Sequence, residues 1–269
     1  MKRKILAAML ATAGLVGAGS ANAVYMIGGV DFGYAGSHIE TTTLAETYIN
    51  GNGQHLLGYG VVNTINGEAN YASGGAQKLY FALDYTSQNF SPTSVEFTNG
   101  VVKLYLGNTF NLLSQSSAAN LGIISSYSQW LQLDGHGFVS PTASANAQII
   151  GAGTLTGASL SFTGTGLLDV NTSGAFGLAS VAAALDTNLI GDIAGGFADI
   201  ALTTSGNNLV LNRFDNTTGC KNGTAQAGQW CVSGSADLRG TTLPEPGTLA
   251  LAGLGLLGAV VARRRKAKA

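Results

Sequence analysis

The sequence predicts a mainly β protein: an antiparallel β-sandwich or barrel-like domain with one or two short helices, an N-terminal signal helix and a single C-terminal hydrophobic helix. Three observations lead to this fold class. The central part consists of short apolar runs separated by Gly, Ser, Thr and Asn. Glycine is abundant, with 39 residues, whereas proline is scarce, with 4, so turns are frequent and strands are rarely interrupted. The longest apolar runs lie at the two ends of the chain.

The N-terminal segment has the order of parts that defines a secretory signal peptide. Basic residues at 2–4 precede an apolar run at 5–18, and the small residues Ala21 and Ala23 follow. This run is too short to span a bilayer stably, and the small residues fit a signal peptidase. We therefore predict cleavage by signal peptidase after Ala23.

The C-terminal segment combines a short motif, an apolar helix and a basic cluster. Pro244, Glu245 and Pro246 precede an apolar run at 248–262 and six mostly basic residues at 263–268. Fifteen residues at about 1.5 Å each make a helix of ~23 Å, below the ~30 Å of a bilayer core. We expect a transient anchor in the inner membrane, with the basic cluster in the cytoplasm and the preceding chain outside.

These C-terminal residues resemble the PEP-CTERM sorting signal. The resemblance covers the last 26 residues, 244–269, and rests on the three parts in their order. It implies recognition and cleavage by an exosortase, with the sorting motif at Pro244, Glu245 and Pro246. It also implies a Gram-negative bacterium that makes exopolysaccharide, and a mature protein at the cell surface or in the extracellular matrix.

The predicted domains are therefore a signal peptide at 1–23, a β-rich extracellular domain at 24–243 and a sorting tail at 244–269. The whole chain has a net charge of −1, but the ends hold eight of the thirteen Lys and Arg residues. The central domain has five basic residues against thirteen carboxylates, a net charge of −8. Such an acidic domain lacks the positive surface that nucleic acids require, so nucleic acid is not an expected partner. An acidic surface could instead recruit divalent cations that bridge it to anionic polysaccharide, although solubility alone also explains the charge.

The two cysteines, Cys220 and Cys231, are predicted to form a disulfide, because export places them in an oxidising compartment. Closing this short loop stabilises the fold by roughly 3 kcal/mol in the chain-entropy model. The alternative is a pair of metal ligands, but no His is near in the sequence.

Individual elements follow from local patterns. Two alternating runs at 94–98 and 101–106 flank Asn99-Gly100, which predicts a hairpin with a type I′ turn. We expect strands at 57–65, 78–85, 148–150, 158–163 and 166–170, and a strand pair at 198–203 and 208–213. Apolar spacing at 112–133 and 175–185 predicts short helices.

The central domain also resembles flocculation-associated PEP-CTERM proteins. This looser resemblance rests on the phrase at 56–67 and on residues 234–238 after the cysteine-bounded loop. It implies a role in holding cells together within an exopolysaccharide floc.

No catalytic constellation or cofactor motif stands out, so we predict no catalytic residues, cofactor or metal site. His38, His55 and His136 are isolated in the sequence, and Asp134 to Gly137 is most simply a turn. One near match remains: Asp169, Asn171 and Ser173 occupy the first, third and fifth positions of a calcium loop. Ser180 stands where the bidentate Glu belongs, so only weak calcium binding is expected.

The first hypothesis is therefore a non-enzymatic protein of the cell surface or matrix that promotes aggregation, as flocculation or biofilm, through contact with exopolysaccharide or another surface polymer. Trp130 and Trp230 are candidates for stacking on sugars. The alternatives are a secreted carbohydrate-active enzyme and a carbohydrate-binding module with the same tail. Paired carboxylates in a groove would favour the enzyme.

Overall fold

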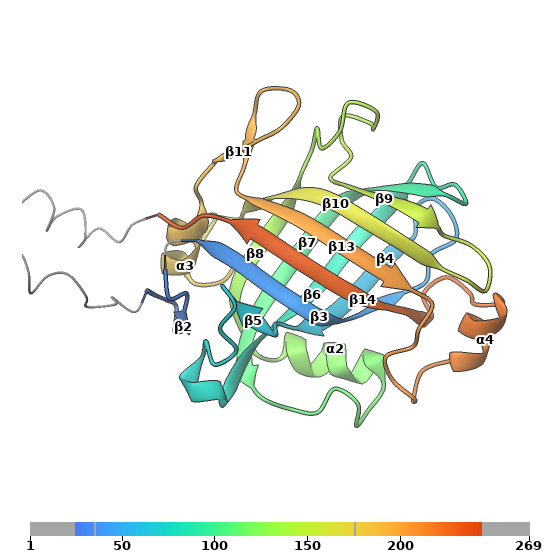
Figure 1. Ribbon diagram of the computed structural model, residues 1–269, viewed down its shortest axis with the longest axis horizontal. Helices are drawn as coiled ribbons and strands as arrows, with labels where there is room; N and C mark the ends of the chain where they lie inside the picture. The colour runs from blue at the N-terminus through green and yellow to red at the C-terminus, as the bar shows by residue number, and fades with distance from the viewer. Residues whose placement is uncertain (1–24, 35, 175, 244–269) are drawn as a thin grey trace, which may run out of the picture.

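The computed structural model describes residues 25–34, 36–174 and 176–243. Over these residues the chain folds into a closed antiparallel barrel (Figure 1). The predicted signal peptide, sorting motif and C-terminal helix lie outside the described residues. No helix within the described ranges is long and apolar enough to cross a membrane.

The main sheet, as far as the chain is described, contains ten strands. They are β3 (Ser37–Thr47), β4 (His55–Val61), β5 (Thr64–Ile65), β6 (Gln77–Gln88), β7 (Ser94–Asn108), β8 (Ser128–His136), β9 (Ile149–Thr154), β10 (Ser161–Val170), β13 (Ile200–Asn207) and β14 (Trp230–Gly240). Around the barrel the order is β13, β14, β3, β4, β6, β7, β8, β10, and β10 pairs with β13 to close it. Closure leaves the main strands without free edges, which protects a secreted β protein from edge-to-edge association.

Strands β8 and β9 share one place in the barrel. Both lie between β7 and β10: β8 pairs with residues 101–106 of β7, and β9 pairs with residues 94–97. The predicted hairpin at Asn99-Gly100 is therefore wrong, because both runs belong to the single strand β7. Asn99 has a φ of 51°, and the β6 register shifts opposite it, so the dipeptide forms a β-bulge where the strand changes neighbours.

Other local predictions were confirmed in part. The strand predicted at 78–85 forms β6 and pairs with β7. The segment at 208–213 is not a strand, because β13 continues through 204–207, the residues that separate the two predicted strands. The helix predicted at 112–133 covers only α2 (Ser117–Ser125), after which the chain enters β8.

Within the described chain there are three short α-helices, one more than expected, and one 3₁₀ turn, η1 (Ser73–Gly75). Besides α2 they are α3 (Ala179–Leu185), as predicted, and α4 (Thr217–Asn222). Ser116 caps α2 by accepting a hydrogen bond from the Ala119 amide, and Asn216 caps α4 in the same way from Gly219. Helix α2 packs on the outside of the barrel, where its Ile124 is buried in one cluster with Tyr59 and Tyr80 of the wall.

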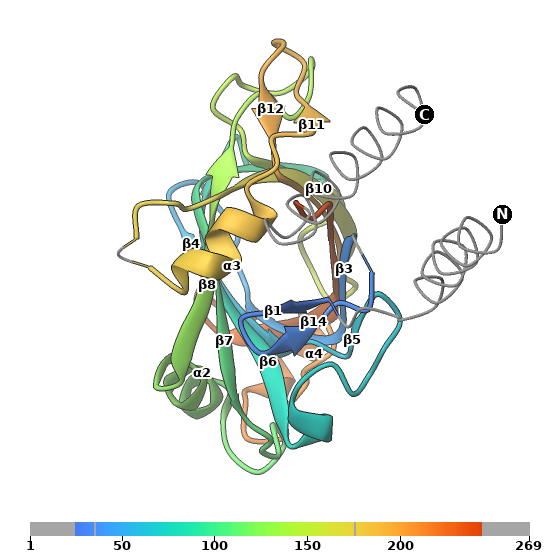
Figure 2. The same cartoon turned by 90° about the vertical axis from the view of Figure 1, so that its left-hand side faces the viewer.

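One end of the barrel is closed by α3 and by the hairpin of β1 (Met26–Ile27) and β2 (Val30–Asp31), as Figure 2 shows. Trp130 donates from Nε1 to the Gly28 carbonyl at 3.0 Å, which fixes the hairpin to β8. A Cβ on Gly28 would come within 2.4 Å of Val181 in α3, so only glycine fits there. The main core fills the barrel from this end.

The two ends of the described chain meet at this closed end. The Leu243 amide donates to the Ala184 carbonyl of α3 at 2.8 Å, and the Tyr25 hydroxyl donates to the Leu243 carbonyl. The segments that precede Tyr25 and follow Leu243 are therefore attached to the same end of the barrel. The opposite end, next to α4, points away from both attachment points (Figure 1).

Candidate functional site

A β-bulge in β3 decides which of its side chains face the outside. Opposite Ser235 of β14, the β3 register advances by one extra residue between Thr41 and Leu44. Before the bulge Ile39 and Thr41 line the interior; after it Leu44 and Glu46 do. The bulge thus leaves Glu40 outside and turns Glu46 inward, although their positions differ by six, an even number that would place both on one face of a regular strand.

The outer surface beside this bulge is formed by four adjacent strands, β3, β14, β13 and β10, which cross the front of Figure 1. Alternate residues on these strands carry hydroxyl groups and lie at least partly exposed on the outer side. We call this surface the hydroxyl face; its members are Thr42, Ser161, Thr163, Thr165, Thr203, Ser205, Ser233 and Ser235.

Register places these hydroxyls in rows across the strands. Ser205 stands between Thr163 on β10 and Ser235 on β14, and its Oγ lies 2.9 Å from Ser235 Oγ. Thr203 stands between Thr165 and Asp237 in the next row. With strands about 4.8 Å apart, the rows present a regular array of hydrogen-bond donors and acceptors. A shallow groove of about 400 Å³ runs along this face between Asn63 and Thr203.

One side of the hydroxyl face ends in an acidic edge. His38 Nε2 lies 2.8 Å from Asp237 Oδ1 and 3.3 Å from Glu40 Oε1, and Arg239 holds the other oxygen of Asp237 at 2.9 Å. Burial raises the pKa of Asp237, but hydrogen bonds from Arg239 and His38 outweigh that effect and lower its pKa overall. Asp237 therefore stays ionised beside the groove.

These residues are the part of the described chain that could hold a metal ion. One ligand atom each from His38, Glu40 and Asp237 can lie within 4.8 Å of one another. One imidazole with two carboxylates suits a divalent transition metal better than calcium, which prefers oxygen alone. The same carboxylates could also form an outer contact with a hydrated cation.

The residues of the calcium hypothesis are already engaged with protein partners. Asp169 accepts from His136 Nδ1 at 2.8 Å, and Asn171 donates to Asp134 while its oxygen accepts from Ser173. Calcium binding at Asp169, Asn171 and Ser173 stays a prediction.

His136 joins two distant segments. The predicted turn at 134–137 is wrong up to His136, because these residues belong to β8. The ring donates from Nδ1 to Asp169 and from Nε2 to Asp192 at 2.9 Å, and since carboxylates only accept, both nitrogens carry protons. Burial lowers the pKa of His136, but the hydrogen bonds with Asp192 and Asp169 raise it above its usual value.

Asp192 lies in the hairpin of β11 (Ile190–Gly191) and β12 (Phe197–Ala198), which projects from the barrel (Figure 2). The pair with His136 therefore fixes this hairpin to the barrel wall, although sequence alone gave no partner for His136.

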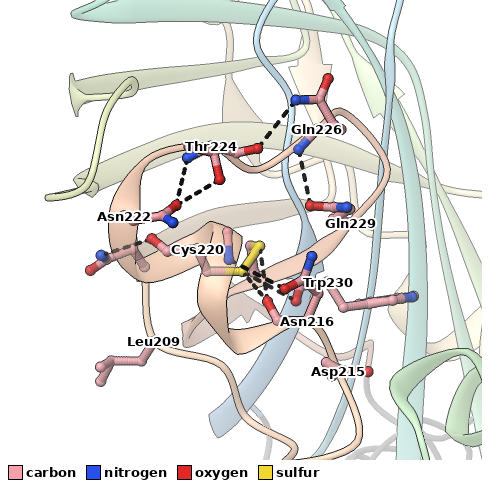
Figure 3. The surroundings of a disulfide bond; sticks show 12 residues. Leu209, Asp215, Asn216, Cys220, Asn222, Thr224, Gln226, Gln229 and Trp230 are labelled. Carbon is pink, nitrogen blue, oxygen red and sulfur yellow. Dashed lines mark hydrogen bonds between the residues drawn. A yellow bond between two sulfur atoms is a disulfide. The ribbon is translucent and has the colours of Figure 1, made fainter.

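The predicted disulfide is confirmed. Cys220 in α4 is bonded to Cys231 in β14, with Cα atoms 5.3 Å apart (Figure 3). Both cysteines are buried with Tyr48, Leu160 and Val232 at the end of the barrel opposite α3. The bond therefore closes that end around α4.

Of the two tryptophans predicted to stack on sugars, Trp230 has exposed surface and Trp130 has almost none. Trp130 is 1% exposed and stacks on Phe32 in the core, so its proposed role is wrong. Trp230 is half-buried with its ring edge against Tyr59. The exposed groups of the hydroxyl face are small and polar instead, a pattern that alternation in 161–165, 203–205 and 233–237 could have revealed strand by strand.

The fold and these surfaces define a closed β-barrel with a polar, partly acidic outer face. The family model of the PEP-CTERM protein-sorting motif matches residues 242–266, beginning where β14 has left the barrel. The chain thus carries a PEP-CTERM sorting motif, which indicates a protein that is exported, processed by an exosortase and sorted to the cell surface. No curated protein and no solved structure matches it. The predicted sites at Ala21, Ala23, Pro244, Glu245 and Pro246 lie outside the described residues.

Proposed function

We propose that this protein is a non-enzymatic component of the extracellular matrix that contacts exopolysaccharide through its hydroxyl face and promotes cell aggregation, as flocculation or biofilm. The observation that carries the proposal is the set of hydroxyl rows on β10, β13 and β14 beside an acidic edge. Sugar polymers present repeating hydroxyl groups, and an array of Ser and Thr can exchange hydrogen bonds with them over several residues. The sorting motif supports delivery to the place where such polymers accumulate.

The acidic edge adds a second kind of contact. With a net charge of −8 over residues 24–243, the body repels an anionic polymer unless cations intervene. A divalent cation held between Glu40 or Asp237 and a polymer carboxylate would turn this repulsion into attraction. Binding should therefore require divalent cations when the polymer is acidic.

The arrangement of the two carboxylates supports a binding role over a glycosidase. Glycosidic cleavage uses two carboxyl groups on opposite sides of the bond, separated by roughly 5 to 10 Å of open space. Here His38 lies between Glu40 and Asp237 and contacts both, while Arg239 occupies the remaining oxygen of Asp237. The groove is shallow, and besides these two carboxylates its walls are Thr, Ser and Asn residues and Ala236.

The test is complementation of a deletion strain. The strain should lose aggregation, and the wild-type gene should restore it. The double variant Thr163→Val and Thr203→Val removes two exposed hydroxyls from the face while keeping strand-compatible shapes, and it should restore aggregation only weakly. Thr142→Val removes an exposed hydroxyl from a loop away from the face and serves as the matched control.

Two outcomes would contradict the proposal: normal aggregation in the deletion strain, or full restoration by the double variant at wild-type protein levels. Immunoblots of the extracellular fraction establish those levels.

A further inference from the structure

The interior of the barrel holds a small, almost wholly apolar cavity. It has a volume of about 70 Å³, and a second space of about 30 Å³ adjoins it through four shared side chains, Leu83, Tyr85, Leu202 and Ala236. The cavity lies toward the end of the barrel closed by the disulfide, where Tyr48, Leu160 and Val232 also line it. Leu56, Phe90 and Phe162 in the lining are only half-buried, so the wall is thinnest beside them.

One carboxyl group stands in this apolar wall. Glu46 is 3% exposed, and its Oε2 is buried without a hydrogen-bond partner among the described residues. The β3 bulge turns it toward the cavity between Leu44 and Thr47. Burial raises the pKa of Glu46 to about 8, so at neutral pH it is mainly a protonated acid that can donate a hydrogen bond.

A second polar group lines the same cavity. Tyr85 of β6 is 2% exposed, and its hydroxyl also lacks a partner within the described chain. Burial and then the nearby Glu46 carboxyl raise the pKa of Tyr85, so it remains a neutral hydroxyl. The titratable side chains that line the cavity are Glu46, Tyr48 and Tyr85.

Two donors that have no partner among the described residues, both beside an apolar cavity, are costly for a core that serves stability alone. Buried polar groups normally have hydrogen-bond partners, and cores normally fill such spaces with side chains. Leu or Met at position 46 would remove the unpaired carboxyl and fill part of the space. The combination matches a ligand pocket: apolar walls with a few polar groups that orient one end of a guest. Eight-stranded barrels are wide enough to hold one small ligand.

We propose that the barrel interior binds a small, neutral, mainly aliphatic molecule with a single carbonyl or hydroxyl oxygen, which accepts hydrogen bonds from Glu46 and Tyr85. The apolar part of the molecule lies against Leu83, Val95 and Leu202. A charged carboxylate is excluded, because the wall offers no cation to pair with it. The two adjoining spaces, of about 70 Å³ and about 30 Å³, limit the guest to a small molecule. This site is separate from the hydroxyl face.

The experiment is a titration of the purified exported protein with 2-alkanones from 2-butanone to 2-octanone, followed by calorimetry and by the shift in melting temperature. Wild-type protein should bind with an optimum at an intermediate chain length and should melt at a higher temperature when loaded. Tyr85→Phe keeps the ring and removes one donor, and should weaken binding about tenfold. Glu46→Leu should abolish it.

Glu40→Gln is the matched control on the outer side of the same strand, and it should bind as wild type within twofold. The proposal is overturned if no 2-alkanone binds the wild-type protein. It is equally overturned if Tyr85→Phe and Glu46→Leu bind as well as Glu40→Gln, since the guest would then not use these donors. Because Tyr85→Phe is a mild change, the test does not depend on whether Glu46→Leu folds.

Discussion

Glu40 and Glu46 belong to the same strand, yet they occupy opposite environments. Glu40 lies on the outside, two-fifths exposed, beside His38 and the hydroxyl face. Glu46 lies inside, 3% exposed, among apolar side chains, and its Oε2 has no hydrogen-bond partner in the described part of the chain. A single bulge separates them. The strand β3 therefore contributes side chains both to the polar outer face and to the apolar interior, and the shift of register at the bulge determines where the change occurs.

The largest expected difference between these surfaces concerns stability. Glu46→Gln should raise the free energy of unfolding by about 3 kcal/mol at pH 7. In the unfolded wild type Glu46 is ionised at this pH and must take up a proton on folding, because its pKa rises from 4.5 to about 8, whereas Gln is neutral in both states. Glu40→Gln should change it by less than about 0.5 kcal/mol. Urea denaturation of the two variants measures both values.

The pH profile of the wild type follows from the same group. The folded-state pKa of Glu46 is raised above its unfolded value of 4.5, so Glu46 adds no penalty below pH 4.5, and the stability of the wild type falls as the pH rises from 4.5 to about 8. Glu46→Gln should flatten the profile in this window. If Glu46→Gln left the dependence of stability on pH unchanged, Glu46 would be hydrated in the folded protein, and its environment would not differ from that of Glu40.

Loss of the disulfide should affect the interior of the barrel more than the hydroxyl face. The double variant Cys220→Ala and Cys231→Ala should lose roughly 3 kcal/mol of stability, because the bond restricts the unfolded chain. Since the bond closes the end of the barrel beside the cavity, binding inside the barrel should weaken while polymer contact at the hydroxyl face persists. Adding reductant should affect the wild type and leave the variant unchanged; an equal response from both would contradict this account.

Replacing a glycine by alanine should lower stability in the barrel wall, at Gly100 of β7, and raise it at Gly122 of the outer helix α2. A Cβ on Gly100 would come within 2.2 Å of the Tyr85 ring, so Gly100→Ala should destabilise the protein by about 1–3 kcal/mol and push Tyr85 into the cavity. Gly122 in α2 has open space around its Cβ position, so Gly122→Ala should stabilise by up to about 1 kcal/mol. Thermal melts compare the two, and equal effects would show that the wall at Gly100 is loosely packed.

The smallest effect is local and concerns the hairpin of β11 and β12. His136→Gln should speed amide exchange at 190–198 severalfold, with little change elsewhere. The raised pKa of His136 means that its contribution is complete below the unfolded value and is lost as the pH rises through the folded one. The pKa of Asp192 is lowered, chiefly by the hydrogen bond with His136, so its contribution is lost in acid. Exchange in the wild type should therefore be slowest between these two limits, and a profile without a minimum would contradict the pairing.

Sequence patterns predicted the fold class but not the closure of the sheet into a barrel. Alternating strands and abundant turn residues predict an antiparallel β protein, and two exported cysteines predict the disulfide. They do not show that β10 pairs with β13, because that contact depends on the whole chain. The same Asn-Gly dipeptide illustrates the limit: Asn66-Gly67 forms a tight turn closed by paired hydrogen bonds between Ile65 and Glu68, whereas Asn99-Gly100 forms a bulge inside β7.

The candidate site was hidden for the same reason. His38, Glu40 and Asp237 are far apart in sequence and meet because β3 pairs with β14. The inward position of Glu46 depends on the bulge at Thr42 and Thr43, and two adjacent Thr residues do not predict a bulge. The alternation of hydroxyl residues within β10, β13 and β14 was visible, but their rows became apparent only with the register.

The outer face of β3, β14, β13 and β10 is proposed to contact polymer, and the interior of the barrel is not. The direct measurement is co-sedimentation of the exported protein with exopolysaccharide isolated from the producing culture, with Ca²⁺ and with a chelator. Wild type and Glu46→Gln should sediment equally in Ca²⁺, whereas Thr163→Val with Thr203→Val should sediment several times less. Equal sedimentation of all three proteins, or loss with Glu46→Gln alone, would contradict the account.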